Sequence, residues 1–224
     1  DIMVSTLFLA ALYYLFLLSK ELSIKNTVLF SISLGLLLGT KTTASSFVLL
    51  LYIPFFYYYL ININSKKATL LFLMSIVFII ITGGFSFIRN FNETGNPFYP
   101  LNLQVFNKTI FKGVIDLVVY KAHTLPQDYS LKKILFSEGL GAQGLLFIFP
   151  ALLIGLPATV FKKRKDFGFT HFYFLILPIL SILIYRFVIP MANLRYLYAV
   201  LAMGMVISFY IVDTFNLPKK LIKV

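Results

Sequence analysis

The feature that most constrains this chain is a series of apolar runs, each long enough to cross a lipid bilayer. A membrane-spanning α-helix needs about 20 predominantly apolar residues, and runs of that order recur along the whole sequence. With 59% hydrophobic and only 12% charged residues, the chain is too apolar for one water-soluble core. We therefore expect an all-α fold, a polytopic membrane helical bundle of about 6–7 membrane helices. The predicted spans are residues 2–18, 44–61, 68–88, 144–161, 169–189 and 194–212.

One apolar segment, "TVLFSISLGLLL" at residues 27–38, is shorter than the others. At 1.5 Å per residue it would reach only about 18 Å across the bilayer. Together with the break "GTKTT" that follows, it predicts either a short tilted helix or half of a re-entrant hairpin. Irregular backbone at membrane depth is tolerated only where protein or water surrounds it. A cavity near Lys41 is therefore expected.

The distribution of basic residues predicts the orientation, because short cytoplasmic connections are enriched in Lys and Arg. If Asp1 is extracytoplasmic, residues 89–143 form the one large extracytoplasmic loop and the C-terminus is cytoplasmic. The reverse orientation would place "KKRK" at residues 162–165 outside, which is disfavoured. In the favoured orientation, short cytoplasmic segments hold more than half of the 20 basic residues: Lys20, Lys25, Lys66, Lys67, residues 162–165, Lys219, Lys220 and Lys223.

The large loop is expected to be ordered and to lie within a single membrane domain, residues 1–224. In residues 106–123 the apolar residues recur at nearly helical spacing, which predicts one short helix. Ser130 can cap a second short helix that ends at Gly139. Both are predicted to be interfacial helices lying on the bilayer. The loop begins with "IRNFNETGNPFYPLN", in which Gly95 and Pro97 predict a tight turn. Because the chain begins at Asp1 and enters an apolar run at once, we expect it to be a fragment of a longer protein.

Among the groups that could carry chemistry, cations at the outer membrane level stand out. There is no Gly-rich phosphate loop, no metal-spaced pair among the two histidines and no cysteine. We attribute the net charge of +12 to the membrane topology and to contact with anionic lipid. No nucleic-acid partner is expected. Arg provides a planar fork for phosphate oxygens and Lys a point charge. The candidate residues are Lys41 in the helix break, Arg89, Arg186 and Arg195.

Each of these cations also has an ordinary structural explanation. Arg89 and Arg186 lie near span ends, where long basic side chains reach the headgroups without any further role. Lys41 and Arg195 are harder to explain in this way, and they are the favoured ligands of an anionic headgroup. Tyr196 and Tyr198 could add hydroxyl donors, but interfacial tyrosines more often belong to an aromatic belt.

Three stretches in order resemble the membrane glycosyltransferases of the GT-C superfamily, the group that includes protein mannosyltransferases and aminoarabinose transferases. They are "SLGLLLGTKTTASSFVLLLYIPFF", "IRNFNETGNPFYPLN" and "NLRYLYAVLAMGMV". Bacterial proteins of this kind carry similar "GLxxGTKxT", "RNxxxTGNPxYP" and "RYL" stretches. The resemblance covers nearly the whole chain and implies a location in the bacterial inner membrane.

The resemblance also implies a reaction and a set of site residues. A sugar would pass from a polyprenyl-phosphate donor to a lipid, glycan or protein acceptor on the extracytoplasmic face, with no certain cofactor and a divalent cation possible. Asp1 matches an acid at the outer start of a membrane helix. The donor phosphate would be held by Lys41 and Arg195, with Arg89 and Arg186 nearby, and the loop over the site would be shaped by Gly95, Asn96, Pro97 and Tyr99.

The implied mechanism needs a base for the acceptor hydroxyl and cations for the leaving phosphate. In the family, the principal catalytic Asp or Glu follows the first membrane helix, so it is expected upstream of Asp1, and this fragment alone is expected to be inactive. Solvated loop charges are the favoured interpretation of the acids Glu93, Asp116, Asp128 and Glu138.

Two other functions remain open from the residues. A polymerase or ligase acting on lipid-linked polysaccharide would also have many spans and a large outer loop. A lipid or solute transporter would place acids and cations at mid-membrane in symmetry-related halves. Because the charges here gather at one face, the transporter ranks last.

Overall fold

The computed structural model describes residues 2–62, 64–105, 108–116, 146, 153, 169–187 and 197–214. The chain divides into two compact units, one built on residues 2–127 and the other on residues 128–185 and 193–224. The described residues are mostly helical, with seven α-helices, which confirms the predicted helical character. Three of the described helices are long and apolar enough to cross a membrane, Ile2–Lys20, Thr42–Ile61 and Lys66–Gly83. The count of 6–7 spans and the single domain stay predictions.

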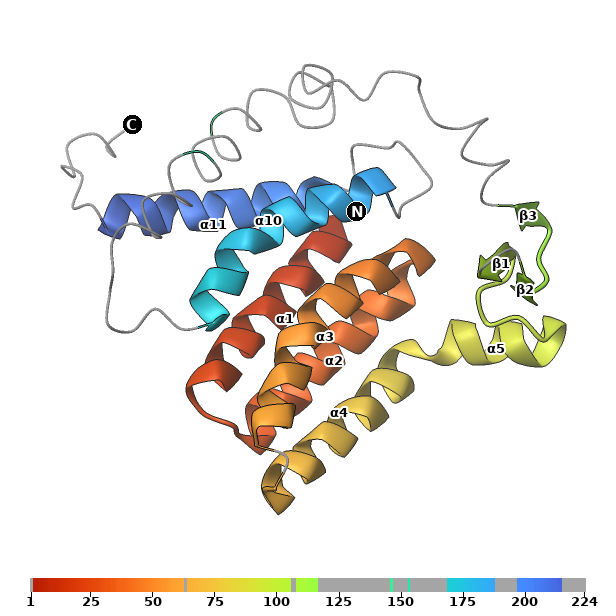
Figure 1. The fold of residues 1–224 in the computed structure, drawn as a ribbon, viewed down its shortest axis with the longest axis horizontal. Coiled ribbons are helices and arrows are strands. Elements are labelled where there is room, and N and C mark those ends of the chain that lie inside the picture. Colours follow the sequence, from red (N-terminus) through yellow and green to blue (C-terminus); the bar gives the residue numbers. More distant parts are fainter. Residues whose placement is uncertain are drawn as a thin grey trace. The chain divides into compact units, whose positions relative to one another are not determined.

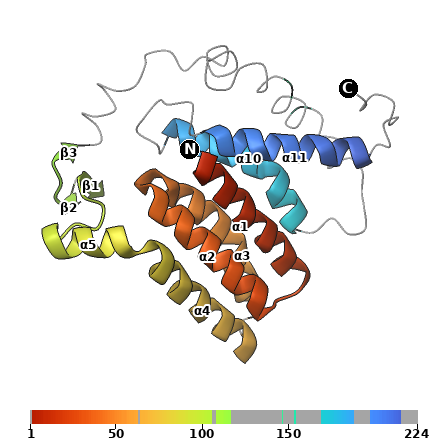
Figure 2. The same ribbon diagram turned by 180° about the vertical axis from the view of Figure 1, so that it is seen from behind.

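The first unit contains four consecutive helices that run alternately up and down (Figure 1). Hydrogen-bonded turns of a few residues join them, so each helix begins close to the end of its predecessor. Helix α2 packs against both α1 and α4, while α3 packs mainly against α1 (Figures 1 and 2). The helices are α1 (Ile2–Lys20), α2 (Ile24–Thr40), α3 (Ser45–Ile61, preceded by the short helix η1, Thr42–Ala44) and α4 (Lys66–Gly83).

Helix α2 is longer than the sequence predicted. It begins at Ile24 because Ser23 caps it, its hydroxyl accepting a hydrogen bond from the Asn26 N–H at 3.2 Å. Its 17 residues reach about 26 Å, so the length predicted for this segment was too short at both ends. The serine cap was the missed signal, since Ser is a preferred residue at this position.

Helices α2 and α4 approach so closely that only glycine fits at their contact. A Cβ on Gly83 would overlap the carbonyl oxygen of Gly35, and a Cβ on Gly35 would overlap the hydroxyl of Thr82. A Cβ on Gly39 would lie 3.3 Å from the Gly83 Cα. Without a hydrophobic driving force between helices in lipid, small residues of this kind allow close backbone packing. The C-terminal ends of α2 and α4 are therefore held side by side.

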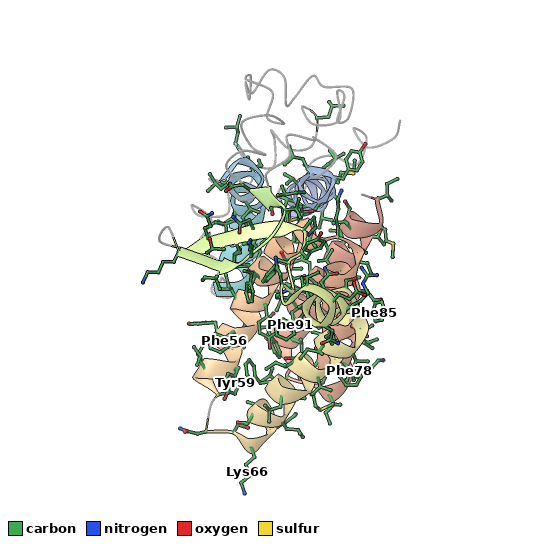
Figure 3. All side chains as sticks on the ribbon, turned by 90° about the vertical axis from the view of Figure 1, so that its right-hand side faces the viewer. Phe56, Tyr59, Lys66, Phe78, Phe85 and Phe91 are labelled. Atoms are coloured by element: carbon green, nitrogen blue, oxygen red, sulfur yellow. The ribbon has the colours of Figure 1, made fainter. Side chains whose placement is uncertain are left out.

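Aromatic side chains pack α3 against α4. Tyr59 stacks on Phe72 with ring centroids 4.3 Å apart, and Phe56 lies 5.8 Å from the same ring. Phe56 and Tyr59 extend from α3 in Figure 3. One helical turn before Phe56 in α3, the Tyr52 hydroxyl is hydrogen-bonded to the Ser75 hydroxyl at 2.8 Å. This contact and the glycine contact hold α4 to two different neighbours.

The predicted span 68–88 was wrong at its C-terminal end. Helix α4 ends at Gly83. After Gly84 a separate helix begins, α5 (Phe85–Thr94), and its axis is inclined to that of α4 (Figure 1). The reason lies in the composition of α5, where Ser, Arg, Asn and Glu interrupt the apolar residues. Such a segment cannot continue across hydrocarbon, because its polar groups would lose their solvation.

A small sheet follows α5, and within residues 108–116 strands replace part of the helix that the sequence predicted for residues 106–123. Residues 106, 107 and 117–123 of that predicted helix lie outside the described residues. Strand β1 (Leu101–Val105) pairs antiparallel with β2 (Lys108–Phe111) and parallel with β3 (Ile115–Asp116), giving the order β2-β1-β3. Thr, Ile, Phe and Val in this stretch favour strands, and that preference prevailed over the helical spacing of its apolar residues. The second predicted loop helix, residues 131–139, lies outside the described residues.

The second unit contributes α10 (Phe169–Phe187) and α11 (Tyr198–Thr214). Helix α10 falls within the predicted span 169–189, and α11 overlaps the predicted span 194–212 but ends two residues beyond it. Leu177 in α10 and Met203 in α11 are fully buried. The predicted span 144–161 lies almost wholly outside the described residues.

The glycine contact predicts that Gly83→Ala destabilises the first unit. The added methyl group has no room beside the Gly35 carbonyl, and overpacking of this kind costs about 1–3 kcal/mol. Unfolding by sodium dodecyl sulfate in mixed micelles measures the change in free energy. Gly39→Ala should cost less, and Leu36→Ala, on the exposed side of the same helix, should have a small effect. Equal stability of Gly83→Ala and the parent protein would contradict the close approach.

Candidate functional site

Two of the predicted site elements lie at the same end of the first unit. The break at Lys41 follows the end of α2, and the junction between α4 and α5 follows the end of α4. Because α2 and α4 meet at their C-terminal ends through Gly39 and Gly83, the break and the junction are neighbours. The opposite end carries four lysines, and Figure 3 shows Lys66 there, far from α5. These lysines are Lys20, Lys25, Lys66 and Lys67.

The helix break at Lys41 is a single extended residue. Lys41 has φ −163° and ψ 139°, and its carbonyl oxygen accepts the Ala44 N–H at 2.9 Å. Hydroxyl groups beside it bond nearby carbonyl oxygens: Thr40 to Leu37 at 2.7 Å and Ser46 to Thr43 at 2.8 Å. These bonds satisfy backbone groups that a broken helix would leave exposed. The polar residues of "GTKTTASS" therefore stabilise the break, and the half-buried Lys41 gives it a positive charge. The predicted cavity beside it stays a prediction.

Arg89 lies on α5 and not at the end of a span. Its side chain is exposed, and Nη2 donates to Asn90 Oδ1 over a long 3.4 Å. Asn90 in turn donates from Nδ2 to the Tyr99 carbonyl oxygen at 3.1 Å. Arg89 is thus linked through Asn90 to the turn that follows α5.

The turn "TGNPFYP" begins where Gly95 ends α5 in a left-handed conformation with φ 71°. Glycine adopts this conformation without the steric cost that a Cβ would bring. The Thr94 hydroxyl donates to the Asn90 carbonyl oxygen at 2.7 Å and accepts the Asn96 N–H at 3.2 Å. The Tyr99–Pro100 peptide bond is cis. The left-handed Gly95 and the Thr94 bonds hold the residues that follow α5 close to its last turn.

Asn96 holds this turn to the sheet. Its side chain is 1% exposed and makes three hydrogen bonds. Oδ1 accepts the Phe98 N–H at 2.8 Å, while Nδ2 donates to the carbonyl oxygens of Leu101 at 2.8 Å and Lys112 at 3.1 Å. Phe98 packs edge-on against Phe87 of α5, with ring centroids 5.8 Å apart. Asn96 therefore shapes the loop from inside, while Pro97 is half-buried and Tyr99 is exposed.

The remaining predicted residues are only partly described. Asp1, Arg195 and Tyr196 lie outside the described residues, as do Asp128 and Glu138. Arg186 lies in α10, and Tyr198 begins α11. Glu93 is exposed on α5. Asp116 stands opposite Asn102 in the parallel register of β3 and β1.

Sequence reasoning missed two contributors to this end of the unit. The pair Gly35 and Gly39 has the small-xxx-small spacing typical of close helix packing, which was a readable signal. Asn90, which joins Arg89 to the turn, had no such signal, because a polar residue in a loop region is ordinary. Both act by fixing the positions of α5 and the turn.

The internal role of Asn96 predicts that Asn96→Ala loosens the turn. Three backbone groups would lose their partner, and each unpaired group can cost about 1–3 kcal/mol when buried. Chymotrypsin cleavage after Phe98 or Tyr99, followed in detergent, should become faster than in the parent protein. Asn92→Ala, an exposed neighbour on α5, is the matched control and should leave the rate unchanged. Similar cleavage rates in both variants would disprove the internal role.

The described part of this end provides cations and a hydrogen-bonded loop. Such groups can bind and position an anion. Within the described residues, no three His, Asp or Glu side chains are grouped so that they could hold a metal ion. In comparisons with known proteins, no protein-family model, curated protein or solved structure matches the chain.

Proposed function

We propose that this chain belongs to a membrane glycosyltransferase that takes a sugar from a polyprenyl-phosphate donor on the extracytoplasmic face. The reaction joins an acceptor hydroxyl oxygen to the anomeric carbon while the bond from that carbon to the phosphate oxygen breaks. The proton of the acceptor goes to a carboxylate of the full-length protein. Cations stabilise the negative charge that remains on the departing lipid phosphate.

The observation that carries the proposal is the helix break at Lys41 beside the ordered start of the outer loop. A lysine on extended backbone where two apolar helices meet places a positive charge at the membrane surface. An anionic headgroup at the membrane surface would be within reach of such a charge. We infer that the headgroup is a sugar phosphate because the three sequence stretches resemble those of GT-C glycosyltransferases.

The charge distribution in the first unit supports the proposed orientation. Lys20, Lys25, Lys66 and Lys67 share the end opposite Lys41. Short connections rich in lysine stay on the cytoplasmic side. The end with the Lys41 break, α5 and the sheet is then extracytoplasmic.

This orientation can be tested with single cysteines, because the chain contains none of its own. Glu93→Cys on the polar side of α5 should react with a membrane-impermeant maleimide added to spheroplasts. Asn64→Cys, in the turn between α3 and α4, should react only after the membrane is permeabilised. Both positions are exposed, so the comparison reports sidedness. The opposite labelling pattern would reverse the topology and refute extracytoplasmic transfer at this end.

The function is tested by sugar transfer from a synthetic polyprenyl-phosphate monosaccharide by the full-length protein. Loss of one charged contact to the phosphate removes about 1.5–3 kcal/mol, so Lys41→Ala and Arg195→Ala should each lower transfer about 10- to 100-fold. Lys25→Ala, an exposed lysine at the opposite end, should retain the parent rate.

The outcomes of this assay separate the candidate functions. Unchanged transfer in both Lys41→Ala and Arg195→Ala would refute the phosphate-binding role of these residues. Activity that requires a glycan-lipid as both donor and acceptor would favour a polysaccharide polymerase or ligase. No transfer by a folded full-length protein, with movement of the lipid across vesicles instead, would favour a transporter.

A further inference from the structure

We propose that α5 is an interfacial helix whose Phe85, Ile88 and Phe91 side chains insert into the outer leaflet of the bilayer. The proposal concerns the contact between this helix and lipid. It takes the side of the membrane from the orientation proposed above but does not depend on glycosyl transfer, so either proposal can fail while the other stands.

The first observation is the division of α5 into two faces. Phe85, Ile88 and Phe91 are spaced three residues apart, which places them on adjoining positions of one side of a helix. They are 73%, 51% and 54% exposed, although each is large and apolar. Glu93 and Asn90 lie on the opposite side of the helix, Arg89 borders Phe85 at the edge of the apolar side, and Asn92 falls between Phe85 and Ile88. A helix with this pattern fits the boundary between hydrocarbon and water.

The second observation is the depth at which α5 begins. Helix α4 has 18 residues and reaches about 27 Å, close to the roughly 30 Å thickness of the hydrocarbon core. Its lysines, Lys66 and Lys67, mark one membrane surface. By Gly83 the chain has therefore crossed to the other surface, and α5 begins only two residues later.

The third observation is the continuity of exposed apolar side chains from α4 into α5. Val77, Ile80 and Ile81, in the last two turns of α4, are exposed in the same way as Phe85 and Ile88. On a membrane-crossing helix, such residues face acyl chains. The lipid that covers the end of α4 is thus the nearest apolar medium for the face of α5.

Contacts with the turn keep α5 from moving deeper into the hydrocarbon core of the bilayer. Asn90 is tied to the Tyr99 carbonyl oxygen, and Phe87 packs on Phe98 in the turn. These contacts fix the rotation of α5 about its own axis, with Phe87 toward the turn. Phe85, Ile88 and Phe91 remain exposed beside this packed side.

The absence of tryptophan from the sequence allows a direct test. Phe91→Trp and Glu93→Trp each introduce a single fluorophore, one on each face of α5. In proteoliposomes, Phe91→Trp should emit at shorter wavelength and lose fluorescence when phospholipids with brominated acyl chains are used. Glu93→Trp should respond weakly to these lipids and strongly to aqueous iodide. Phe87→Trp adds a reporter on the face that contacts the turn.

Each outcome decides the proposal. Strong quenching of Phe91→Trp by brominated lipid, with little quenching of Glu93→Trp, supports insertion. Short-wavelength emission from Phe91→Trp without lipid quenching would mean that protein covers this face, and it would overturn the proposal. Equal iodide quenching of both variants would place α5 in water and overturn it as well. Retained melting behaviour of each variant in detergent shows that the fold is intact.

Discussion

The contact between Gly35 of α2 and Gly83 of α4 is the constraint on which the rest of the first unit depends. Lipid tails are as apolar as the side chains of these helices, so hydrophobicity alone does not bring the helices together. Close backbone packing supplies dispersion contacts in its place. Because the contact lies at the C-terminal ends of both helices, it brings the Lys41 break and the start of α5 to the same end. A shift of this contact by one helical turn would separate them.

The outer elements are built on that end by polar contacts of short range. Gly95 ends α5, Asn96 ties the turn to β1 and to the Lys112 carbonyl oxygen, and Asn90 ties α5 to Tyr99. None of these bonds requires a large hydrophobic core, which a loop of this size could not provide. The loop is consequently ordered by asparagine side chains, which carry both donors and acceptors for backbone groups. This explains why a chain so rich in apolar residues places Asn and Gly directly after a span.

The sequence predicted the secondary structure correctly where one physical effect dominates. It failed where two effects favour different structures. Length and hydropathy located α1, α3 and most of α4, because only helices satisfy the backbone in lipid. The turn at Gly95 followed from Gly95 and Pro97 as turn residues. The end of α4 and the strands after Pro100 were missed, because apolar residues continue past Gly84 and also recur near helical spacing in residues 106–123. Asn96 was expected to shape the loop over a substrate, but its three bonds to Phe98, Leu101 and Lys112 depend on contacts along the chain that no local pattern encodes.

Helix α4 ends earlier than predicted, and this changes the interpretation of Arg89. At the end of a span, an arginine could simply extend to the headgroups, which requires no ligand. On α5 it already begins outside the helix that crosses the hydrocarbon, four residues after Phe85 and at the edge of the face that Phe85, Ile88 and Phe91 form. Its guanidinium needs no long reach to water, and its weak 3.4 Å bond to Asn90 leaves most of its five donors for other partners. An anionic lipid headgroup beside an inserted helix is the partner that this arrangement favours, since the same apolar face that anchors α5 brings the charge to headgroup level.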